Sequence, residues 1–263
     1  MRFGNRPDTK MEIVPDPWLK SIINSDVFRI ADFRFNDPNL NSLISEFKIQ
    51  ENAFYYAKIP VTEHSGTIRQ LLDLGFKNIE INTVLERKPG PVIKPDGLNI
   101  TIRLARPDES RILQNIAAVC FSKSRFHRDE QIPKKIADSI KKKWVENYFN
   151  GERGECIYVA AVDEKPVGFL AVMKITAENQ TIRIIDLIGI HPKFQKCGIG
   201  DQMVKFFIQD SLGKCNLLRV GTQLINIPSL HLYEKNGFQI SDASYVLHAH
   251  IRNGSVIPDN NRQ

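Results

Sequence analysis

The feature that most constrains the fold is an apolar strand that leads through a glycine-bearing loop directly into a helix. Residues 184–190 are mainly aliphatic, which is typical of a buried strand. The loop 195–200 follows, and residues 203–208 then place apolar side chains on one helical face. Because a helix N-terminus presents unpaired N–H groups and partial positive charge, this arrangement predicts an anion site.

The composition of the loop favours a phosphate group as the anion. Gly198 and Gly200 lack a Cβ, so a phosphate can approach the backbone closely, and Lys196 adds a mobile cation. The loop is not a Walker loop, since no Gly-Lys-Ser/Thr follows it. It also lacks the third glycine and the spaced acidic residue of the dinucleotide-binding fingerprint. Glycines before a helix also occur without any ligand. Whether this loop binds a phosphate must therefore be judged together with the neighbouring elements.

Two longer patterns narrow the interpretation. The loop fits [QR]-x-x-G-x-[GA], and a later segment fits N-x-x-[AS]-x-x-x-Y-x-x-x-G-F. The residues that fill the two patterns are Gln195, Gly198 and Gly200, then Asn226, Ser229, Tyr233, Gly237 and Phe238. Both patterns, together with a loop placed after the fourth strand of its region, resemble the GNAT acetyltransferase superfamily.

The resemblance implies an α/β fold of the GNAT type. Its central sheet is mixed and mostly antiparallel, with splayed fourth and fifth strands flanked by helices. It also implies acetyl-CoA as co-substrate and no metal. The implied coenzyme-binding residues are Ile188, Gly189, Ile190, Gln195, Lys196, Cys197, Gly198, Ile199, Gly200 and Asn226.

The same resemblance makes Tyr233 the general acid. A phenol and a thiol have similar pKa values, so proton transfer to the departing thiolate is nearly balanced. The acyl oxygen would be bound by backbone N–H groups at a bulge in the fourth strand. The group that removes the proton of the attacking amine is not assigned. Water is one candidate, and the others are acidic or imidazole side chains, namely Asp108, Glu152, Glu155, Asp186 and His191.

The chain divides at a proline-rich stretch, residues 87–97. We expect a smaller α/β N-terminal domain over 1–97, a catalytic domain over 98–252 and a loose tail over 253–263. Within the N-terminal domain, strand 54–59, helix 66–76 and strand 79–85 follow one another as the segments around residues 217–251 do. This favours a degenerate, partial GNAT-like half without the phosphate loop, although a generic glycine cap explains the likeness equally well.

The catalytic domain has a legible series of periodic segments. We expect helices from 107, at 134–149, after residue 200 and at 228–235. The expected strands are 98–104, 156–162, 167–176, 181–190, 217–222, 238–240 and 245–251.

The formal net charge of +6 makes nucleic-acid binding a question to settle. The densest basic run, residues 134–143, lies opposite apolar positions of a helix and has no accompanying aromatic stacking motif. We interpret it as a solvated face that attracts anionic ligands. The four cysteines show no Cys-x-x-Cys and no metal-ligand spacing, so free thiols in a cytoplasmic protein are expected. No signal peptide or membrane span is expected.

The acceptor region is similar to that of the dTDP-fucosamine acetyltransferases within the superfamily. The resemblance rests on residues 124–126 (Ser-Arg-Phe), 144–147 (Trp-Val-Glu-Asn), 74–76 (Leu-Gly-Phe) and 222–223 (Thr-Gln). It implies an amino-sugar nucleotide as acceptor, with Arg125, Phe126 and Trp144 on the substrate side. Arg125 is suited to a pyrophosphate because its planar guanidinium is bidentate. The tract 127–135 departs from that pattern.

The sequence therefore predicts an acetyl-CoA-dependent N-acetyltransferase in which an amine attacks directly within a ternary complex. The preferred acceptor is the amine of a nucleotide-linked amino sugar. Acetylation of a protein or small amine, and a non-catalytic acyl-CoA-binding module, are the alternatives. The oligomeric state, including a homodimer, stays open.

Overall fold

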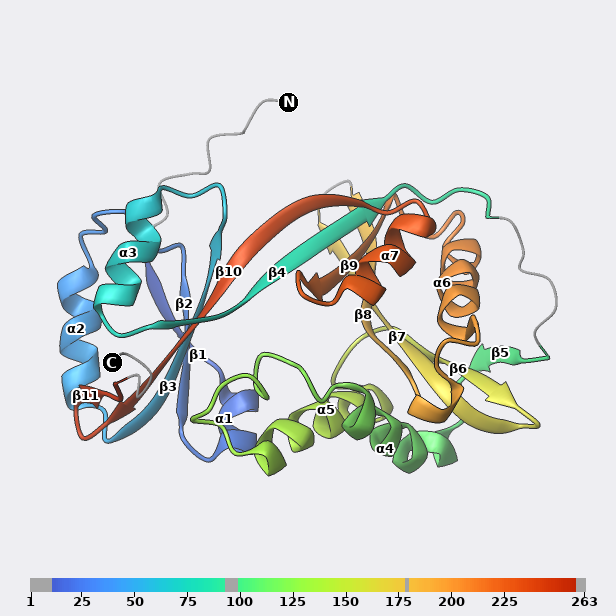
Figure 1. Ribbon diagram of the computed structural model, residues 1–263, viewed down its shortest axis with the longest axis horizontal. Helices are drawn as coiled ribbons and strands as arrows, with labels where there is room; N and C mark the ends of the chain where they lie inside the picture. The colour runs from blue at the N-terminus through green and yellow to red at the C-terminus, as the bar shows by residue number, and fades with distance from the viewer. Residues whose placement is uncertain (1–10, 93–98, 178–179, 259–263) are drawn as a thin grey trace. The chain divides into compact units, whose positions relative to one another are not determined.

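The computed structural model describes residues 11–92, 99–177 and 180–258, which divide into two compact units (Figure 1). Unit 1 comprises the chain up to residue 81, residues 128–132 and the chain from residue 243. Unit 2 comprises residues 82–127 and 133–242. This division differs from the expected ranges 1–97 and 98–252, because a long strand carries the chain into unit 2 before the proline-rich stretch begins. The expected domain ranges 1–97, 98–252 and 253–263 stay a prediction.

Unit 1 is built on a sheet in the order β1, β2, β3, β10 and β11. Neighbouring strands are antiparallel except β2 and β3, which are parallel. The bounds of these strands are β1 Glu12–Pro15, β2 Asp26–Ala31, β3 Asn52–Pro60, β10 Gln239–Arg252 and β11 Ser255–Val256. The expected strands 238–240 and 245–251 are thus one strand, and the first residues of the expected loose tail pair as β11.

Three helices accompany this sheet: α1 Pro17–Ile23, α2 Leu40–Ile49 and α3 Ser65–Asp73. Alternate residues of β3 face opposite ways, so Tyr55 and Ala57 join the core under α2 and α3, to which Leu43 and Leu71 contribute. The first 50 residues show no clear hydrophobic periodicity, and β1, α1, β2 and α2 were accordingly not foreseen.

Unit 2 is a mixed, mostly antiparallel sheet in the order β4, β9, β8, β7, β6, β5. Only β8 and β9 are parallel. The strands are β4 Lys77–Arg87, β5 Thr101–Leu104, β6 Cys156–Val162, β7 Lys165–Ala177, β8 Gln180–Ile190 and β9 Leu217–Gln223. The predicted fold class is confirmed by this sheet.

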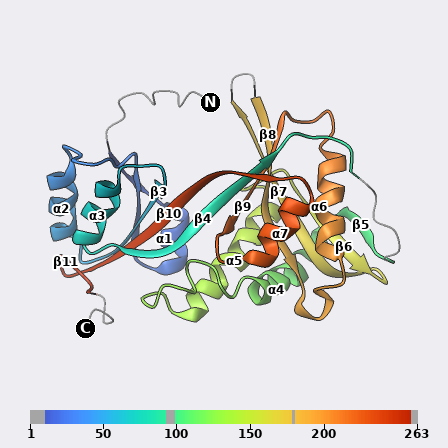
Figure 2. The same cartoon turned by 45° about the horizontal axis from the view of Figure 1, so that its top comes forward.

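Two pairs of helices cover the two faces of the unit 2 sheet (Figure 2). The period of two along β6 assigns the faces: Ile157 and Val159 pack with α4 and α5, whereas Tyr158 and Ala160 pack with α6 and α7. The helices and short 3-10 turns are η1 Pro107–Glu109, α4 Ser110–Cys120, α5 Lys134–Phe149, η2 Pro192–Phe194, α6 Ile199–Asp210 and α7 Ile227–Lys235. Within the described part of the chain, no helix is both long and apolar enough to cross a membrane.

Candidate active site

The predicted anion loop has the backbone geometry that its glycine requires. Gly198 is the residue before α6 and has φ of 80°, a left-handed conformation that side chains with a Cβ rarely adopt. The first bond within the helix runs from the N–H of Gln202 to the carbonyl of Gly198. The amides of residues 199–201 therefore precede the helical ladder and can meet an anion.

The other loop residues have distinct places. The side chain of Gln195 donates to the carbonyl of Ile190 at 2.9 Å, which ties the loop to the end of β8. Lys196 and Cys197 are exposed, whereas the side chain of Ile199 is buried in the core. A Cβ on Gly200 would lie 3.5 Å from the side chain of Leu232, so the start of α6 lies against α7.

β8 contains one extra residue at Asp186. Its pairing with β7 shifts register there, because Ala171 faces Leu187 while the next residue, Val172, faces Ile185. This is a β-bulge, and it has a visible effect on packing. Ile185 and Leu187 are two residues apart yet lie in the cores on opposite faces of the sheet.

The bulge also marks the point at which β8 and β9 part. Their parallel pairing runs from Ile182 to Ile185 on β8, and it ends there although β8 continues to Ile190 and β9 to Gln223. The edge of β8 beyond the bulge thus has no strand partner on the β9 side in the described chain. The predicted splay between the fourth and fifth strands is present.

The register shows which backbone groups occupy this edge. The N–H of His191 donates to the carbonyl of Val167 on the β7 side. Because the direction alternates along an antiparallel ladder, Ile188 and Ile190 turn their N–H and C=O groups away from β7. The hydrogen bond that the carbonyl of Ile190 accepts from the Gln195 side chain is consistent with this orientation. Two N–H groups thus point toward the unpaired edge of β8, and their binding of an acyl oxygen stays a prediction.

Gly189 lies between these two residues and faces the other way. A Cβ there would come within 3.1 Å of the ring of Phe169 and 3.3 Å of Cys120 on α4. The glycine lets α4 pack closely against the strand, so its contribution is to packing. Burial raises the pKa of the Cys120 thiol to about 11, which makes it a poor nucleophile at neutral pH.

Asp186 is held by side chains from α5 and the turn after it. Its carboxylate accepts from Trp144 Nε1 at 2.8 Å, from the Tyr148 hydroxyl at 2.7 Å, and from Arg153 at 2.7 and 2.9 Å. Burial opposes the charged form, but these donors keep the pKa of Asp186 below its usual range. A carboxylate with four donors and a lowered pKa is unsuited to be the general base.

Of the other base candidates, two are also engaged elsewhere. Glu155 accepts from the buried Arg183 at 2.9 Å. His191 caps η2, where its ring nitrogen accepts from the N–H of Lys193 at 3.3 Å. Asp108 lies in η1, and Glu152 lies in the turn after α5. The assignment of a base, or of water in its place, stays a prediction.

Tyr233 lies on α7, and its side chain is 3% exposed. Its ring packs edge-on against Phe238, with ring centroids 6.0 Å apart. Among the described residues the hydroxyl has no hydrogen-bond partner, and burial alone raises the pKa of Tyr233. The phenol is therefore protonated at neutral pH and carries a proton that no neighbouring side chain holds.

Asn226 is the residue before α7, but its side chain does not cap the helix. Its amide nitrogen donates to the Thr222 hydroxyl at 3.3 Å instead. A half-buried carboxamide that leaves its helix uncapped is free to meet another amide, such as those of a pantetheine arm. This binding role stays a prediction.

The predicted acceptor residues are placed differently from one another. Arg125 is half-buried and lies over the ring of Phe126, 4.5 Å from its centroid, while Phe126 itself is buried. Trp144 is bound to Asp186, and Lys141 lies 4.1 Å from its ring centroid. Phe126 and Trp144 thus contact protein groups, and their contact with an acceptor stays a prediction, as does the role of Arg125.

The segment that carries Arg125 is fixed to α5 by a relay of side chains. The Ser124 hydroxyl lies 2.7 Å from His127 Nδ1, and His127 Nε2 lies 2.9 Å from the carboxylate of Asp138. Hydrogen bonding from Lys134 lowers the pKa of Asp138, with a smaller contribution from His127. The polar tract is therefore anchored at Ser124 and His127.

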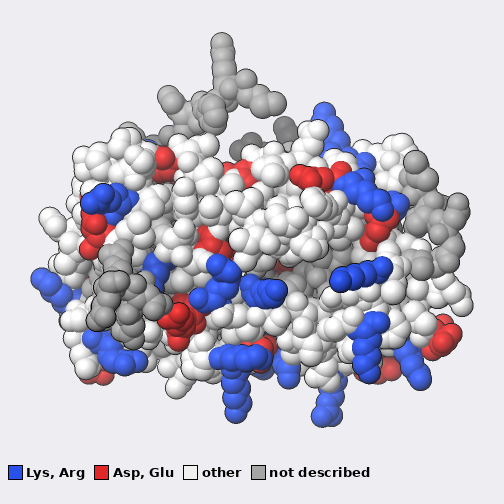
Figure 3. All heavy atoms as spheres, in the orientation of Figure 1, with Lys and Arg blue, Asp and Glu red and all other residues white. Residues whose placement is uncertain are grey.

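The basic run of α5 is partly neutralised within the helix. Lys134 pairs with Asp138 at 2.8 Å, and Lys143 pairs with Glu146 at 2.7 Å. On the face shown in Figure 3, lysine and arginine side chains stand mostly apart, with acidic and uncharged ones between them. Such a surface is that of a solvated helix, as the sequence suggested.

The sequence did not reveal Tyr148 and Arg153 as part of the site. The only sequence signal was the spacing of Trp144 and Tyr148, four residues apart on one helix face, which is also the spacing of an ordinary packed face. Their common partner on β8 becomes visible only in the folded chain.

Residues 153–240 match the model of a family described as Acetyltransferase (GNAT) domain. The matched range contains the bulged strand, the loop, α6, β9 and α7. The spore coat polysaccharide biosynthesis protein SpsD of Bacillus subtilis (strain 168) is 28% identical over 143 residues. Those residues are 54% of this chain and 48% of SpsD, so the chain aligns with about half the length of that curated relative.

Two solved structures share the fold over most of the chain. A functionally unknown conserved protein from Staphylococcus epidermidis ATCC 12228 has a TM-score of 0.63 at 13% identity, covering 93% of this chain and 92% of its own. A GCN5-related N-acetyltransferase from Sphaerobacter thermophilus has a TM-score of 0.59 at 12% identity, covering 92% and 76%. At such identities the likeness concerns the fold.

Proposed function

Since residues 153–240 form a GNAT acetyltransferase domain, we propose that the protein transfers an acetyl group from acetyl-CoA to an amine. The observation that carries the proposal is the end of β8. There the bulge at Asp186 stops the pairing with β9, directly before the outward amides of Ile188 and Ile190 and the glycine-led start of α6.

The proposed reaction uses these parts in turn. The pyrophosphate of the coenzyme binds the amides of residues 199–201, and the acyl oxygen accepts from the N–H groups of Ile188 and Ile190. The acceptor amine attacks the acyl carbon, the negative charge forms on the oxygen bound there, and the carbon–sulfur bond then breaks. Tyr233 gives its proton to the departing thiolate, and the amine loses a proton to water.

The proposed acceptor is the amine of a nucleotide-linked amino sugar. Two observations support it: the name of the relative SpsD refers to polysaccharide biosynthesis, and Arg125 lies on the anchored polar segment next to α5. A sugar diphosphate would gain charge-assisted hydrogen bonds from a guanidinium, whereas a neutral amine would gain little. Because acetyl-CoA and nucleotide-sugars are cytoplasmic metabolites, we place the reaction in the cytoplasm.

The test is a thiol-release assay with acetyl-CoA against a matched panel of nucleotide-linked amino sugars, free amino sugars, polyamines and peptides. We expect turnover with a nucleotide-linked sugar. Arg125→Ala should raise the Michaelis constant for that acceptor roughly 10- to 100-fold, the effect of losing a charged hydrogen bond, and leave that for acetyl-CoA unchanged. Lys123→Ala, which removes an exposed cation of the same segment, is the matched control.

Two results would separate the parts of the proposal. Turnover with peptides or polyamines but with no sugar would overturn the acceptor assignment and keep the transferase. Absence of thiol release with the whole panel, combined with tight acetyl-CoA binding, would favour a non-catalytic acyl-CoA module instead.

A further inference from the structure

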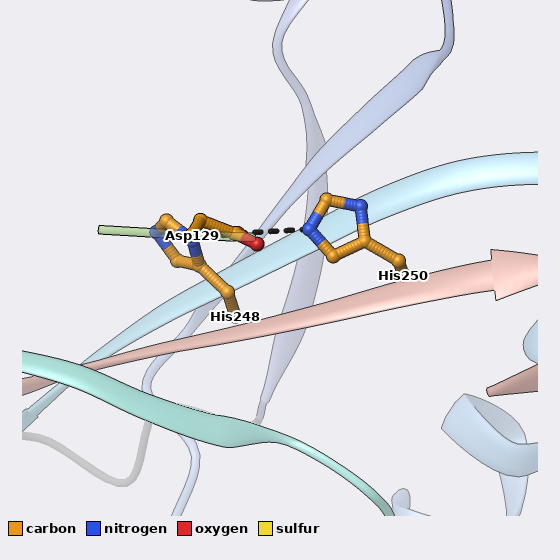
Figure 4. A group of neighbouring side chains, drawn as sticks. All are labelled: Asp129, His248 and His250. Carbon is orange, nitrogen blue, oxygen red and sulfur yellow. Dashed lines mark hydrogen bonds and ion pairs between the residues drawn. The ribbon is translucent and has the colours of Figure 1, made fainter. Parts of the chain in front are cut away.

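A buried cluster of three ionisable side chains lies in unit 1 and takes no part in the site described above. Asp129 comes from the segment 128–132, and His248 and His250 come from β10. Figure 4 shows both imidazole rings turned toward the carboxylate of Asp129. One nitrogen of each ring and one carboxylate oxygen lie within 4.8 Å of one another.

The two ring nitrogens meet at a single carboxylate oxygen. His248 Nδ1 lies 2.6 Å and His250 Nε2 lies 2.8 Å from Oδ2 of Asp129. The side chains of Asp129 and His248 are 2% and 1% exposed, and that of His250 is 15% exposed. The cluster is therefore nearly closed to water, with access from the His250 side.

The rings are held in these orientations by the sheet. His248 and His250 alternate with Ala249, so they share one face of β10. Phe54 of β3 lies opposite His250 in the register, stacks on its ring, and meets the ring of His248 edge-on, with centroids 4.8 Å apart in both pairs. An aromatic wall thus fixes both imidazoles before any ligand arrives.

The carboxylate is held equally firmly from its own side. Its second oxygen, Oδ1, accepts from the N–H of Gln131 at 3.0 Å, and the carbonyl of Asp129 accepts from the N–H of Ile132 at 3.0 Å. Arg128 Nε donates to the carbonyl of Ile79 at 3.1 Å. The turn therefore orients one oxygen toward the histidines and keeps the other hydrogen-bonded, as metal-ligating carboxylates commonly are.

The charge of the cluster favours a cation. A carboxylate removed from water is costly to bury unless a positive charge accompanies it. Asp129 is almost fully buried, and the positive partners within its reach in the described chain are the two imidazoles, at 2.6 and 2.8 Å. Protons on the imidazoles supply hydrogen bonds in the ion-free chain, and a divalent cation would replace them.

We propose that Asp129, His248 and His250 form a divalent metal site that selects zinc-like ions. Two imidazoles with one carboxylate are a known ligand set for Zn²⁺, with water in the fourth position. Mg²⁺ and Ca²⁺ prefer oxygen ligands alone. Ligands bound at roughly 2.0–2.1 Å to a tetrahedral ion lie about 3.3 Å apart, so the present contacts must open by about half an ångström, which small side-chain rotations allow.

A bound ion would join segment 128–132 to β10 within unit 1. The site is independent of the proposed acetyl transfer, and binding can be measured without any acceptor. No sequence pattern indicated the site, because Asp129 lies 119 residues before His248, and a pair of histidines two residues apart on a strand is no metal motif by itself.

The experiment is calorimetry of the full chain, treated with a chelator and returned to buffer, with zinc as the probe. It is done in a Cys197→Ser background, because that exposed thiol is itself a zinc ligand. We expect one equivalent of Zn²⁺ and no heat with Mg²⁺. His250→Ala should weaken binding at least on the order of 100-fold, since even loss of an outer partner costs about 10- to 100-fold. His231→Ala removes an exposed histidine of α7 as the matched control.

A second measurement covers the case in which His250→Ala is poorly folded. Asp129→Asn keeps the size of the side chain and removes the charge, and the visible spectrum of bound Co²⁺ reports four-coordinate ligation directly. We expect intense bands in the parent chain and their loss in Asp129→Asn. Zinc binding that is absent, equal in the His250→Ala chain, or lost in His231→Ala would overturn the site, as would a Co²⁺ spectrum unchanged by Asp129→Asn.

Discussion

The two units contain the same succession of elements but differ in strand pairing and in the loop before the first helix. In unit 1, β2 leads through residues 32–39 to α2, then to β3 and α3. In unit 2, β8 leads through residues 191–198 to α6, then to β9 and α7. Both loops are eight residues long, and both strand pairs, β2 with β3 and β8 with β9, are parallel. Whether unit 1 is a degenerate half of the same fold stays a prediction.

The second helices of the two series end alike. α3 and α7 each have nine residues and are followed by a left-handed glycine, Gly75 with φ of 90° and Gly237 with φ of 77°. The next residue, a buried phenylalanine in both, donates its N–H five residues back, to Leu71 in α3 and to Tyr233 in α7, at 3.0 Å in each case. Leucine thus occupies the position that holds the candidate acid in unit 2.

The strands differ in how far they pair. β2 pairs with β3 up to Ile30, the last residue but one of the strand. β8 pairs with β9 only up to Ile185, and its last five residues have no partner on that side in the described chain. A closed pair of strands has no backbone groups left for a ligand, whereas an open pair has.

The loops differ in what occupies the helix start. Residues 32–39 contain no glycine and two aspartates, and the carboxylate of Asp37 accepts from the N–H of Asn39 at 2.9 Å. The carboxylate of Asp37 thus binds the residue directly before α2, whereas the residue directly before α6 is Gly198. The comparison shows three differences on a similar succession of elements, namely the bulge, the glycine loop and the phenol, and these carry the proposed site.

The largest effect is expected from Tyr233→Phe, which keeps the aromatic ring on α7 and removes only the hydroxyl group. The corresponding position of α3 is Leu71, which has no proton to give. Turnover should fall roughly 10²- to 10⁴-fold, the usual contribution of a positioned acid, with acetyl-CoA affinity unchanged. Steady-state kinetics and calorimetry measure the two effects. Tyr245→Phe, a half-buried tyrosine of unit 1, should have no effect. Near-normal turnover, with chemistry rate-limiting, would show that water protonates the thiolate.

Asp186→Asn tests whether the hydrogen bonds of Asp186 with Trp144, Tyr148 and Arg153 stabilise the bulge. Removing one partner of a buried ion pair costs about 3–5 kcal/mol, so the free energy of unfolding in urea should fall by roughly that amount. Asp26→Asn on β2 removes an exposed pair with Lys20 and should cost less than about 1 kcal/mol. Equal losses of unfolding free energy in the two variants would mean that the contacts of Asp186 contribute no more than a surface ion pair.

The same pair predicts an acid dependence. Because the folded pKa of Asp186 is lowered, its contribution to stability is complete above the unfolded value of 3.8 and is lost as the pH falls through the folded pKa. Between pH 6 and pH 3 the parent chain should therefore lose more stability than Asp186→Asn. Identical acid profiles would contradict the assignment.

Gly198→Val tests the start of α6, where unit 1 has Asn39 in place of the glycine. A β-branched residue at this positive φ costs about 1–3 kcal/mol and blocks close approach of a phosphate. Acetyl-CoA affinity should fall by roughly 10- to 100-fold. Gly213→Val is the matched control, since Gly213 has φ of 73° and open space around it. If both variants bind the coenzyme equally well, the loop is not the phosphate site.

The smallest effect concerns alkaline pH. Since burial raises the pKa of Tyr233 above its ordinary value of 10, the phenol should stay protonated through the assay range. Turnover of the parent enzyme should therefore not fall between pH 8 and pH 9.5 through loss of the Tyr233 proton. The pH profiles of the parent and of Tyr233→Phe should have the same shape in that range. A descending limb in that window, absent from the variant, would show that the phenol is more exposed to water in the working enzyme.

The sequence was sufficient for everything that is local. The strand, the loop 195–200, the helix after it and the pattern from Asn226 to Phe238 are contiguous, so propensity and spacing define them together. The mixed sheet followed from the order of these segments. The first 50 residues lack such periodicity, and the sequence divides the long strand β10 in two because residues 241–244 are small or polar (Ser-Asp-Ala-Ser).

The features that shape the site were not local. The partners of Asp186 lie 33 to 42 residues before it, on a helix whose face reads as ordinary packing. A bulge changes no residue type, only the register between two strands, and a single strand's sequence does not contain its register. The cluster of Asp129 with His248 is more distant still.

The extra residue in β8 has an evolutionary consequence. Because Ile185 and Leu187 lie on opposite faces, deleting Asp186 would make them consecutive residues of a regularly alternating strand and leave every residue up to Ile190 on its present face. The bulge can therefore be gained or lost in a single step, without a compensating change in the apolar pattern. A polar residue set between like aliphatic neighbours is the trace that it leaves, and descendants of this chain can be sorted by whether they keep it.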